Sequence, residues 1–429
     1  MPIMNQRGRY LPTWVPTPIR QNLLEKEKID LTKLTKPRNG NEYTFSVIKA
    51  DVGSYTGHVM PHPKLLEKAE YLLREAVKEG KLIDGIVSRV GDDIHLLMTH
   101  NEGIRSKKIH GLAWDIFTEL TEIAKDLHLY GAGQDLLKSE FSGNLQGMGP
   151  GVCEMDIVER KTEPIIFFAA DKTSPYIWNR PLFEMFADHR ATIGLIVDEK
   201  MQDGFIFEVK ELKTGFNSLF HFPQDLTALL AYIGSQAYAI ERVWRPKDKT
   251  VVAVTSTSRL SFIAGKYVGK DDPVMLVRVQ SGLPAVGEAL NPFTFPSLVP
   301  GGMRGSCWRP FMPCSMFDCD PAINDGPPRV IALGFQMKEG EFSNPIDHLG
   351  DISFEHARWN ALKVADYMQR HGAFEPGRLS DEDLEYGGIP KVRQKVMGRF
   401  TDITTIENSQ EKIFNLLNAK LKEQTVLSK

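Results

Sequence analysis

Cysteine is scarce in this chain, which has only 4 cysteines in 429 residues. So few cysteines cannot build a disulfide framework, and the composition therefore predicts a protein of the reducing cytoplasm. Three of them cluster in "CWRPFMPCSMFDC", at Cys307, Cys314 and Cys319. Their spacing does not match paired zinc ligands and no histidine lies nearby, so we interpret them as free thiols in an irregular loop.

Long apolar runs and an excess of one charge sign are also absent. No stretch approaches the roughly 20 apolar residues that span a bilayer, and prolines interrupt the start of the chain where a secretory signal would need an apolar run. The 52 basic and 55 acidic residues give a net charge of −3. This balance argues against a broad nucleic-acid or membrane surface. With 42% hydrophobic residues, the chain is expected to be a globular protein.

The chain divides into three parts by composition. Residues 1–43 hold five prolines and eight basic residues with little periodicity, which indicates an extension or arm. Residues 44–400 show no linker that would separate two units, and we expect them to form one large catalytic domain. Residues 401–429 include a helical pattern and are predicted to form a C-terminal helical tail.

Apolar periodicity predicts the order β-α-β-β-α-β-β between residues 43 and 171. The first helix is indicated by Leu65, Leu66, Ala69 and Leu73, which recur at helical spacing. Later strands are expected in "GFIFEVKEL", "TVVAVTST", "VMLVRV" and "RVIALGFQM", and later helices in "EHARWNALKVADYMQRHG" and "SQEKIFNLLNAKLKEQ". This order favours an α+β fold with helices on the faces of sheets over a doubly wound parallel sheet.

Carboxylates follow or precede several of the expected strands. They are Asp51 after "FSVIKA", Asp92 and Asp93 after "IVSRVG", Asp171 after "IIFFAA", and Asp271 and Asp272 before "PVMLVRV". Each one alone is compatible with a turn or a helix cap, but six at strand ends can converge on one crevice. Carboxylates gathered in this way repel one another unless cations neutralise them. Mg²⁺ is the cation that prefers such oxygen ligands, and the number of carboxylates predicts several ions.

Two lysines stand beside these carboxylates. In "GKYVGKDDPVM" Lys270 precedes two aspartates and follows Tyr267, and Lys172 follows Asp171. An uncharged lysine near a tyrosine is suited to carbonyl chemistry, in which the amine forms an imine and the phenol transfers a proton. Alternatively, both lysines hold a phosphate as point charges. The residue chemistry alone favours neither interpretation.

A series of motifs gives a more specific indication. In order, the chain contains "SVIKADVGS", "VGDD", "LYGAGQDLL", "FSGN", "GMGPGV", "ADKT", "GKYVGKDDPVM", "GLPAVGEAL", "LVPGGMRGS", "DGPPR" and "VADYMQRHG". Taken together, they resemble the bifunctional fructose-1,6-bisphosphate aldolase/phosphatase family. The resemblance implies a four-layer α-β-β-α sandwich that assembles as a homo-octamer. It also implies one gluconeogenic site that condenses dihydroxyacetone phosphate with glyceraldehyde 3-phosphate and then removes the C1 phosphate to leave fructose 6-phosphate.

The same resemblance implies a role for each matching residue. Lys270 would form the Schiff base, Tyr267 would transfer its proton, and Asp51 would be the general base of the phosphatase reaction. The Mg²⁺ ligands would be Asp51, Asp92, Asp93, Gln134, Asp171, Asp271 and Asp272. The substrate contacts would be His58, Tyr130, Gly143, Asn144, Lys172, Gln280, Arg304, Asp325 and Tyr386.

Two features depart from the family pattern. The chain reads "VQSG" where members typically have Gln-His-Gly, so Ser281 replaces a histidine expected to contact substrate. The N-terminal extension is the other departure, because members typically start close to the first strand. Two alternatives to the bifunctional enzyme therefore stay open: a Mg²⁺-dependent sugar phosphatase without aldolase activity, and a non-catalytic oligomer that binds sugar phosphates.

Overall fold

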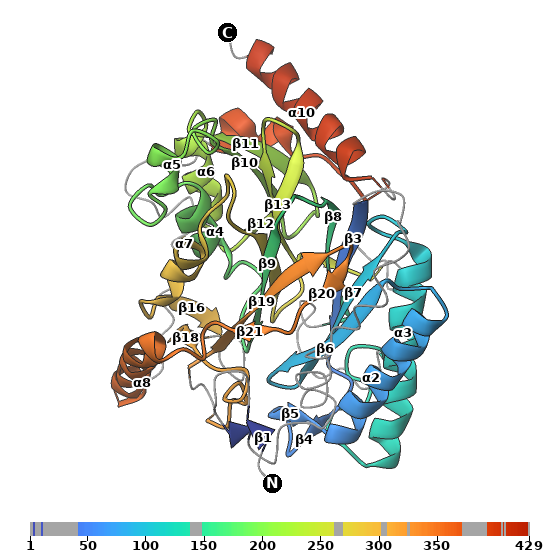
Figure 1. Cartoon of the computed structure of the whole chain (residues 1–429). Coiled ribbons are helices and arrows are strands. Elements are labelled where there is room, and N and C mark those ends of the chain that lie inside the picture. The colour runs from blue at the N-terminus through green and yellow to red at the C-terminus, as the bar shows by residue number, and fades with distance from the viewer. Residues whose placement is uncertain are drawn as a thin grey trace.

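The computed structural model describes residues 3–4, 10–11, 42–137, 148–260, 269–301, 307–323, 327–370, 393–404, 406 and 409–427. Most of them form two largely antiparallel sheets with helices outside (Figure 1). Three small two-stranded ladders complete the strands: β1 (Ile3–Met4) with β2 (Tyr10–Leu11), β4 (Ser54–Tyr55) with β5 (Met60–Pro61), and β16 (Leu298–Gly301) with β17 (Cys307–Pro310).

The smaller sheet has five strands in the order β14-β8-β3-β7-β6. Their bounds are β3 (Glu42–Ala50), β6 (Asp84–Val90), β7 (Asp93–His100), β8 (Gly151–Val158) and β14 (Ser258–Arg259). Two amphipathic helices, α2 (Pro63–Lys78) and α3 (Lys107–Asp126), pack on its outer face. In α2, His62 caps the first turn by accepting a hydrogen bond from the Lys64 amide, and Pro63 occupies the first helical position.

The larger sheet has ten strands, with β11-β10-β12-β13-β15-β9-β19-β18 as its main path and β20 and β21 paired to β19. Their bounds are β9 (Glu163–Asp171), β10 (Phe205–Glu211), β11 (Asn217–Phe222), β12 (Tyr238–Arg245), β13 (Thr250–Thr255), β15 (Val274–Arg278), β18 (Met312–Pro313), β19 (Arg329–Lys338), β20 (Glu341–Phe342) and β21 (Ile346–Asp347). The other helical segments are α4 (Asn179–Phe186), α5 (Gly194–Val197), α6 (Leu226–Ile233), α7 (Val286–Leu290), η3 (Asn291–Phe293), η4 (Ile352–Phe354), α8 (Glu355–Arg370), η5 (Met397–Arg399) and α10 (Gln410–Leu427).

Three hydrophobic cores separate four layers. Strand alternation sends Phe45 and Val47 of the smaller sheet toward Phe167 and Leu276 of the larger one, which forms the middle core. A second core lies between the smaller sheet and helices α2 and α3, and a third lies between the larger sheet and helices α4, α6 and α7. The expected α-β-β-α sandwich and α+β class are therefore confirmed.

Apart from the short strands β4 and β5, which were not predicted, the predicted order between residues 43 and 171 is also confirmed, by β3, α2, β6, β7, α3, β8 and β9. The sequence analysis did not predict strands β11 and β12 of the larger sheet, or helices α4 and α6, which pack on that sheet. The division at residues 43 and 400 stays a prediction. The tail beyond it contains helix α10, whose Ile413, Phe414 and Leu417 pack into the middle core.

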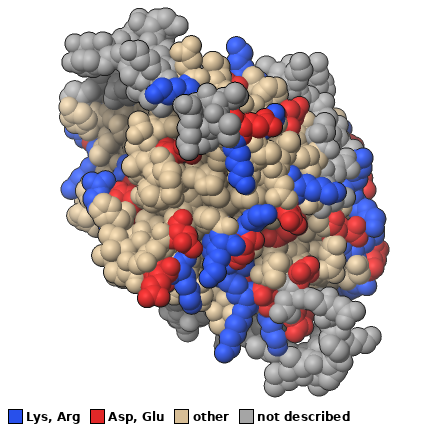
Figure 2. All heavy atoms as spheres, turned by 90° about the horizontal axis from the view of Figure 1, so that it is seen from above, with Lys and Arg blue, Asp and Glu red and all other residues tan. Residues whose placement is uncertain are grey.

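Two surface properties follow from the described residues. Among these residues, no helix is both long and apolar enough to cross a membrane. Figure 2 shows Lys and Arg side chains interspersed with Asp and Glu on the face seen from above.

Candidate active site

Antiparallel pairing brings the polar strand ends together. Because β9 and β15 are antiparallel, Asp171 at the end of β9 lies next to the start of β15, which Asp271 and Asp272 precede. In the smaller sheet, β3 ends beside the start of β7, so Asp51 comes near the turn that contains Asp92. Both groups lie at one end of the space between the two sheets, as the sequence predicted.

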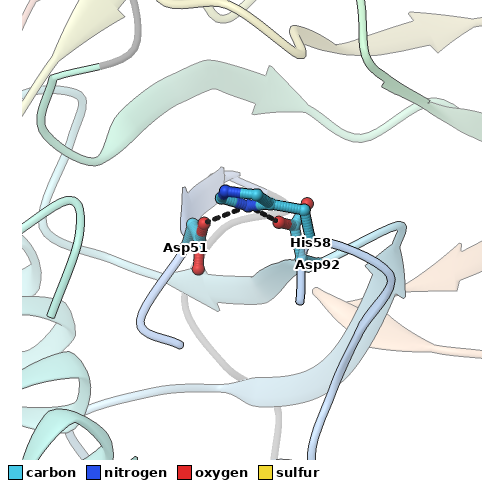
Figure 3. A group of neighbouring side chains, drawn as sticks. All are labelled: Asp51, His58 and Asp92. Carbon is cyan, nitrogen blue, oxygen red and sulfur yellow. Dashed lines mark hydrogen bonds and ion pairs between the residues drawn. The ribbon is translucent and has the colours of Figure 1, made fainter. Parts of the chain in front are cut away.

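Asp51, His58 and Asp92 form a candidate cation site (Figure 3). One ligand atom of each lies within 4.8 Å of the others. His58 Nδ1 is 2.8 Å from Asp92 Oδ2 and 3.9 Å from Asp51 Oδ2. The Tyr130 ring meets the His58 ring edge-on, with centroids 4.8 Å apart. Two of the predicted substrate contacts, His58 and Tyr130, therefore lie beside the predicted metal ligands Asp51 and Asp92.

Lys172 and Asp171 lie on the other side of Asp92. The Lys172 ammonium donates to Asp92 Oδ1 at 2.7 Å and to Asp171 Oδ1 at 3.2 Å. Gly91 permits this close approach, because a Cβ built on it would be only 2.1 Å from Asp171 Oδ1. Its φ of 55° also favours glycine. The β6–β7 turn therefore holds Asp92 between a histidine and a lysine.

Lys270 is buried and lies between two carboxylates. Its Nζ is 3.1 Å from Asp135 Oδ1 and 3.1 Å from Asp271 Oδ1. Asp135 Oδ2 also accepts a hydrogen bond from the Asp51 amide at 3.0 Å. Asp135 thus connects the lysine expected to form the imine with the backbone of Asp51, the residue expected to act as general base.

Burial and like charge change the acidity of these groups. Burial, reinforced by Asp92 and Asp135, raises the pKa of Asp51 well above its usual value. Burial also raises the pKa of Asp135 and that of Asp171 to about 7. Burial disfavours the charged form of Asp92, but Lys172 and His58 outweigh it and hold its pKa below the usual value.

The same forces keep Lys270 protonated in this arrangement. Burial opposes its positive charge, but Asp135 and Asp271 outweigh burial and raise the pKa of Lys270 above the usual value for lysine. A protonated amine is not a nucleophile, so this geometry describes Lys270 in its resting, ion-paired form.

The donor atoms of the site suit a hard cation. Asp171 Oδ2 and Gln134 Oε1 are buried and make no hydrogen bond with the residues that the structure describes. Within the described part of the site, carboxylates outnumber lysines: Asp51, Asp92, Asp93, Asp135, Asp171, Asp271 and Asp272 stand against Lys49, Lys172 and Lys270. Free oxygen donors and excess negative charge are what an oxygen-ligated divalent cation needs.

Comparison with known proteins identifies the family. The sequence profile described as fructose-1,6-bisphosphatase matches residues 42–401. The chain belongs to this family. A protein of Moorella thermoacetica named fructose-1,6-bisphosphate aldolase/phosphatase is 52% identical over 365 residues, which cover 85% of this chain and 96% of that protein. A protein with the same name from Methanocaldococcus jannaschii is 50% identical over 372 residues, which cover 86% of this chain and 95% of that protein. Another from Thermococcus kodakarensis is 51% identical over 372 residues, which cover 85% of this chain and 99% of that protein.

Gln280 is a predicted substrate contact that the chain does not bring to this site. It lies beyond the far end of β15, whose five residues separate it from Asp272 by about 17 Å or more. Its side chain is exposed, and its carbonyl accepts a hydrogen bond from Arg160 at 2.7 Å. Ser281 follows it at the surface. The structure therefore places Gln280 away from the carboxylates and lysines of this site.

Six other predicted residues cannot be placed. Tyr267, Gly143, Asn144, Arg304, Asp325 and Tyr386 lie outside the described residues.

Two site residues were missed at the level of sequence. Lys49 lies two positions before Asp51 on β3, so it shares its face of the strand, and its ammonium pairs with Asp93. That alternation could have revealed it. Asp135 follows the predicted ligand Gln134, and only the local turn decides that its carboxylate reaches Lys270.

Proposed function

We propose that this chain is a bifunctional fructose-1,6-bisphosphate aldolase/phosphatase. It joins dihydroxyacetone phosphate to glyceraldehyde 3-phosphate and hydrolyses the C1 phosphate of the product to give fructose 6-phosphate. The names of the relatives support this activity. The structural observation that carries it is a buried lysine, Lys270, whose amine lies 3.1 Å from two carboxylates at the edge of a cation site.

In the aldolase reaction, Lys270 acts as the nucleophile. Its neutral amine attacks the ketone carbon of dihydroxyacetone phosphate, and water leaves as the imine forms. Loss of a proton gives an enamine, which forms the new carbon–carbon bond with the aldehyde, and water then releases the product from the lysine. Because Asp135 and Asp271 favour the charged amine, Lys270 reacts only after at least one of these ion pairs is broken. Tyr267 is the proposed proton carrier.

In the phosphatase reaction, Asp51 is the proposed general base. Burial, Asp92 and Asp135 raise its pKa, which makes its carboxylate a stronger base toward water. Lys172, which donates to Asp92, provides a positive charge for a phosphate, and His58, 3.9 Å from Asp51, provides a ring nitrogen for a hydrogen bond. The other proposed substrate contacts are Tyr130, Gly143, Asn144, Arg304, Asp325 and Tyr386, with Gln280 from a second copy.

Mg²⁺ is the proposed cofactor, with several ions in each site. Asp51, Asp92, Asp93, Gln134, Asp171, Asp271 and Asp272 would hold them. When bound, such ions neutralise phosphate oxygens and lower the pKa of water. The free oxygens of Asp171 and Gln134 support this assignment.

A homo-octamer in the cytoplasm is the proposed state of the protein. The position of Gln280, far from the site of its own chain, supports an assembly of several copies. The described cysteines Cys153, Cys314 and Cys319 are free and buried, which supports a reducing compartment. Sugar phosphates are the proposed ligands; nucleic acid and membranes are not expected partners.

A coupled assay tests the proposal. Both triose phosphates are supplied with Mg²⁺, and fructose 6-phosphate is followed over time, with Lys270→Ala as the matched variant. We expect product from the wild type and none from the variant. Hydrolysis of fructose 1,6-bisphosphate without condensation by the wild type would leave a sugar phosphatase. A wild type that neither condenses the triose phosphates nor hydrolyses fructose 1,6-bisphosphate would indicate a sugar-phosphate-binding protein.

A further inference from the structure

The segment that follows β18 contacts the β6–β7 turn, which holds Asp92 in the active site. We call residues 314–320 the brace. At its start, the Cys314 amide donates to the Val330 carbonyl on β19 at 2.9 Å. Two residues later, the Met316 amide donates to Asp347 Oδ2 at 3.1 Å. These bonds tie the beginning of the brace to the larger sheet.

The end of the brace meets the turn that presents Asp92. The Gly91 amide donates to the Cys319 carbonyl at 2.9 Å. Gly91 is also the residue that lies against Asp171, and the candidate cation ligand Asp92 is next in the chain. A shift of this turn would therefore move Asp92 relative to both His58 and Lys172.

A partly buried ion pair fixes this contact. Arg89 is only 3% exposed, and its guanidinium reaches both carboxylate oxygens of Asp320, with the Nη2 to Oδ2 distance 3.1 Å. Arg89 is on β6, two residues before Gly91. A two-pronged Arg–carboxylate pair restrains orientation as well as distance. Asp320 thus connects the end of the brace to the strand that leads into the Asp92 turn.

We propose that Arg89 and Asp320 are positioning residues that set the divalent-cation affinity of the Asp92 turn. Groups that orient metal ligands without touching the metal commonly contribute about 10- to 100-fold to metal affinity. The inference rests on the proposed cation dependence of the active site. Beyond that cation dependence, we infer that contacts between the brace and the Asp92 turn, made outside the ligand set, control the cation affinity.

A purely structural role for the pair would have a different consequence. Loss of Asp320 would leave the Arg89 charge buried without its partner, and the whole protein would become less stable. If that were its only effect, the melting temperature would fall while the folded protein bound cations as before. Affinity and stability must therefore be measured separately.

The test uses Mn²⁺ as the probe. The full-length protein is stripped with EDTA, dialysed and titrated with Mn²⁺, and free Mn²⁺ is read by electron paramagnetic resonance. Three variants are compared with the wild type: Asp320→Asn, Arg89→Lys and the control Asp248→Asn. Asp248 makes a comparable two-pronged pair with Arg245, at the β12–β13 turn away from the brace. The melting temperature of each cation-free variant is recorded alongside.

We expect Asp320→Asn to weaken the tightest class of Mn²⁺ site by about tenfold. Arg89→Lys keeps the buried charge but loses the two-pronged pairing with Asp320, so it should give a smaller loss of Mn²⁺ affinity. It tests the inference even where Asp320→Asn fails to fold. Asp248→Asn should bind as the wild type does. Wild-type affinity in folded Asp320→Asn or Arg89→Lys would overturn the inference while leaving the proposed function intact. A wild type that binds no Mn²⁺ would overturn both.

Discussion

Two groups of buried charges lie between the sheets, and they differ in how their charges balance. In the active site, carboxylates outnumber lysines, and burial raises the pKa of Asp135 and that of Asp171 to about 7. A second cluster, Glu208, Lys210, Glu241 and Arg242, lies on β10 and β12, which β13 separates from β15. It contains two carboxylates and two cations.

The opposite charges of the second cluster are paired with one another. Lys210 pairs with Glu241 at 2.7 Å, and Arg242 pairs with Glu208 at 2.9 Å. Burial disfavours the ionised form of Glu241, but Lys210 and Arg242 outweigh it and hold its pKa below the usual value. The two groups therefore differ in what disturbs them. Removing one member of the paired cluster leaves a buried charge without its partner and destabilises the fold, whereas the excess carboxylates of the active site destabilise it until cations bind.

The largest expected effect is on catalysis. Asp51→Asn removes the proposed general base, so phosphate release from fructose 1,6-bisphosphate should fall by about 10²- to 10⁴-fold. In EDTA the same variant should melt a few degrees higher than the wild type, because it removes a carboxylate that Asp92 and Asp135 repel. Phosphate release and thermal melting are measured on the same preparation. Wild-type hydrolysis would contradict the assigned role, and a lower cation-free melting temperature would contradict the repulsion.

The opposite result is expected in the second cluster. Glu241→Gln leaves Lys210 without its buried countercharge and leaves Arg242 with Glu208 alone, which should lower the free energy of unfolding by about 3–5 kcal/mol. The variant does not touch the active site, so the folded protein should keep its turnover. Urea unfolding and the coupled assay at low temperature give the two values. A Glu241→Gln variant that lost activity while its stability was unchanged would contradict the structural role assigned to this cluster.

A smaller effect is expected from a buried neutral histidine. His100 Nδ1 accepts a hydrogen bond from the Glu102 amide at 3.2 Å, and Nε2 lies 2.8 Å from Ser46 Oγ. Burial lowers the pKa of His100 to about 4, so the unfolded chain takes up a proton at a higher pH than the folded protein. Stability should therefore fall as pH drops from 6.5 toward 4.

Between pH 7 and pH 5, this histidine should account for about 2 kcal/mol of lost stability. His100→Asn should remove that part of the loss, and His128→Asn, at an exposed position, serves as the control. Urea unfolding at several pH values measures it. Equal pH profiles for wild type and His100→Asn would show that His100 is not responsible.

Much of the site could be predicted because strands end in recognisable ways. Asp51, Asp92 and Asp171 each follow a clear apolar run, and antiparallel pairing brings such ends together. Asp135 could not be found in this way, since it lies in a turn where no periodicity says which side chain points inward. Gln280 shows the opposite limit: its motif suggests a substrate contact, but the direction of β15 takes it away from the site of its own chain.

The elements missed by sequence reasoning have a similar cause. Strand β12 contains Glu241 and Arg242 in its centre, which hides its apolar alternation, and their burial becomes favourable only when Glu208 and Lys210 face them. Helices α4 and α6 have eight residues each, too few for a strong periodic pattern.

The most direct test of the account traps the imine on Lys270. The enzyme is incubated with dihydroxyacetone phosphate, reduced with borohydride, digested and examined by mass spectrometry, with Lys270→Arg treated in parallel. We expect one reduced adduct, on the peptide that contains Lys270, and none in the variant. No adduct in a wild type that still hydrolyses fructose 1,6-bisphosphate, or an adduct on Lys172 instead, would contradict it.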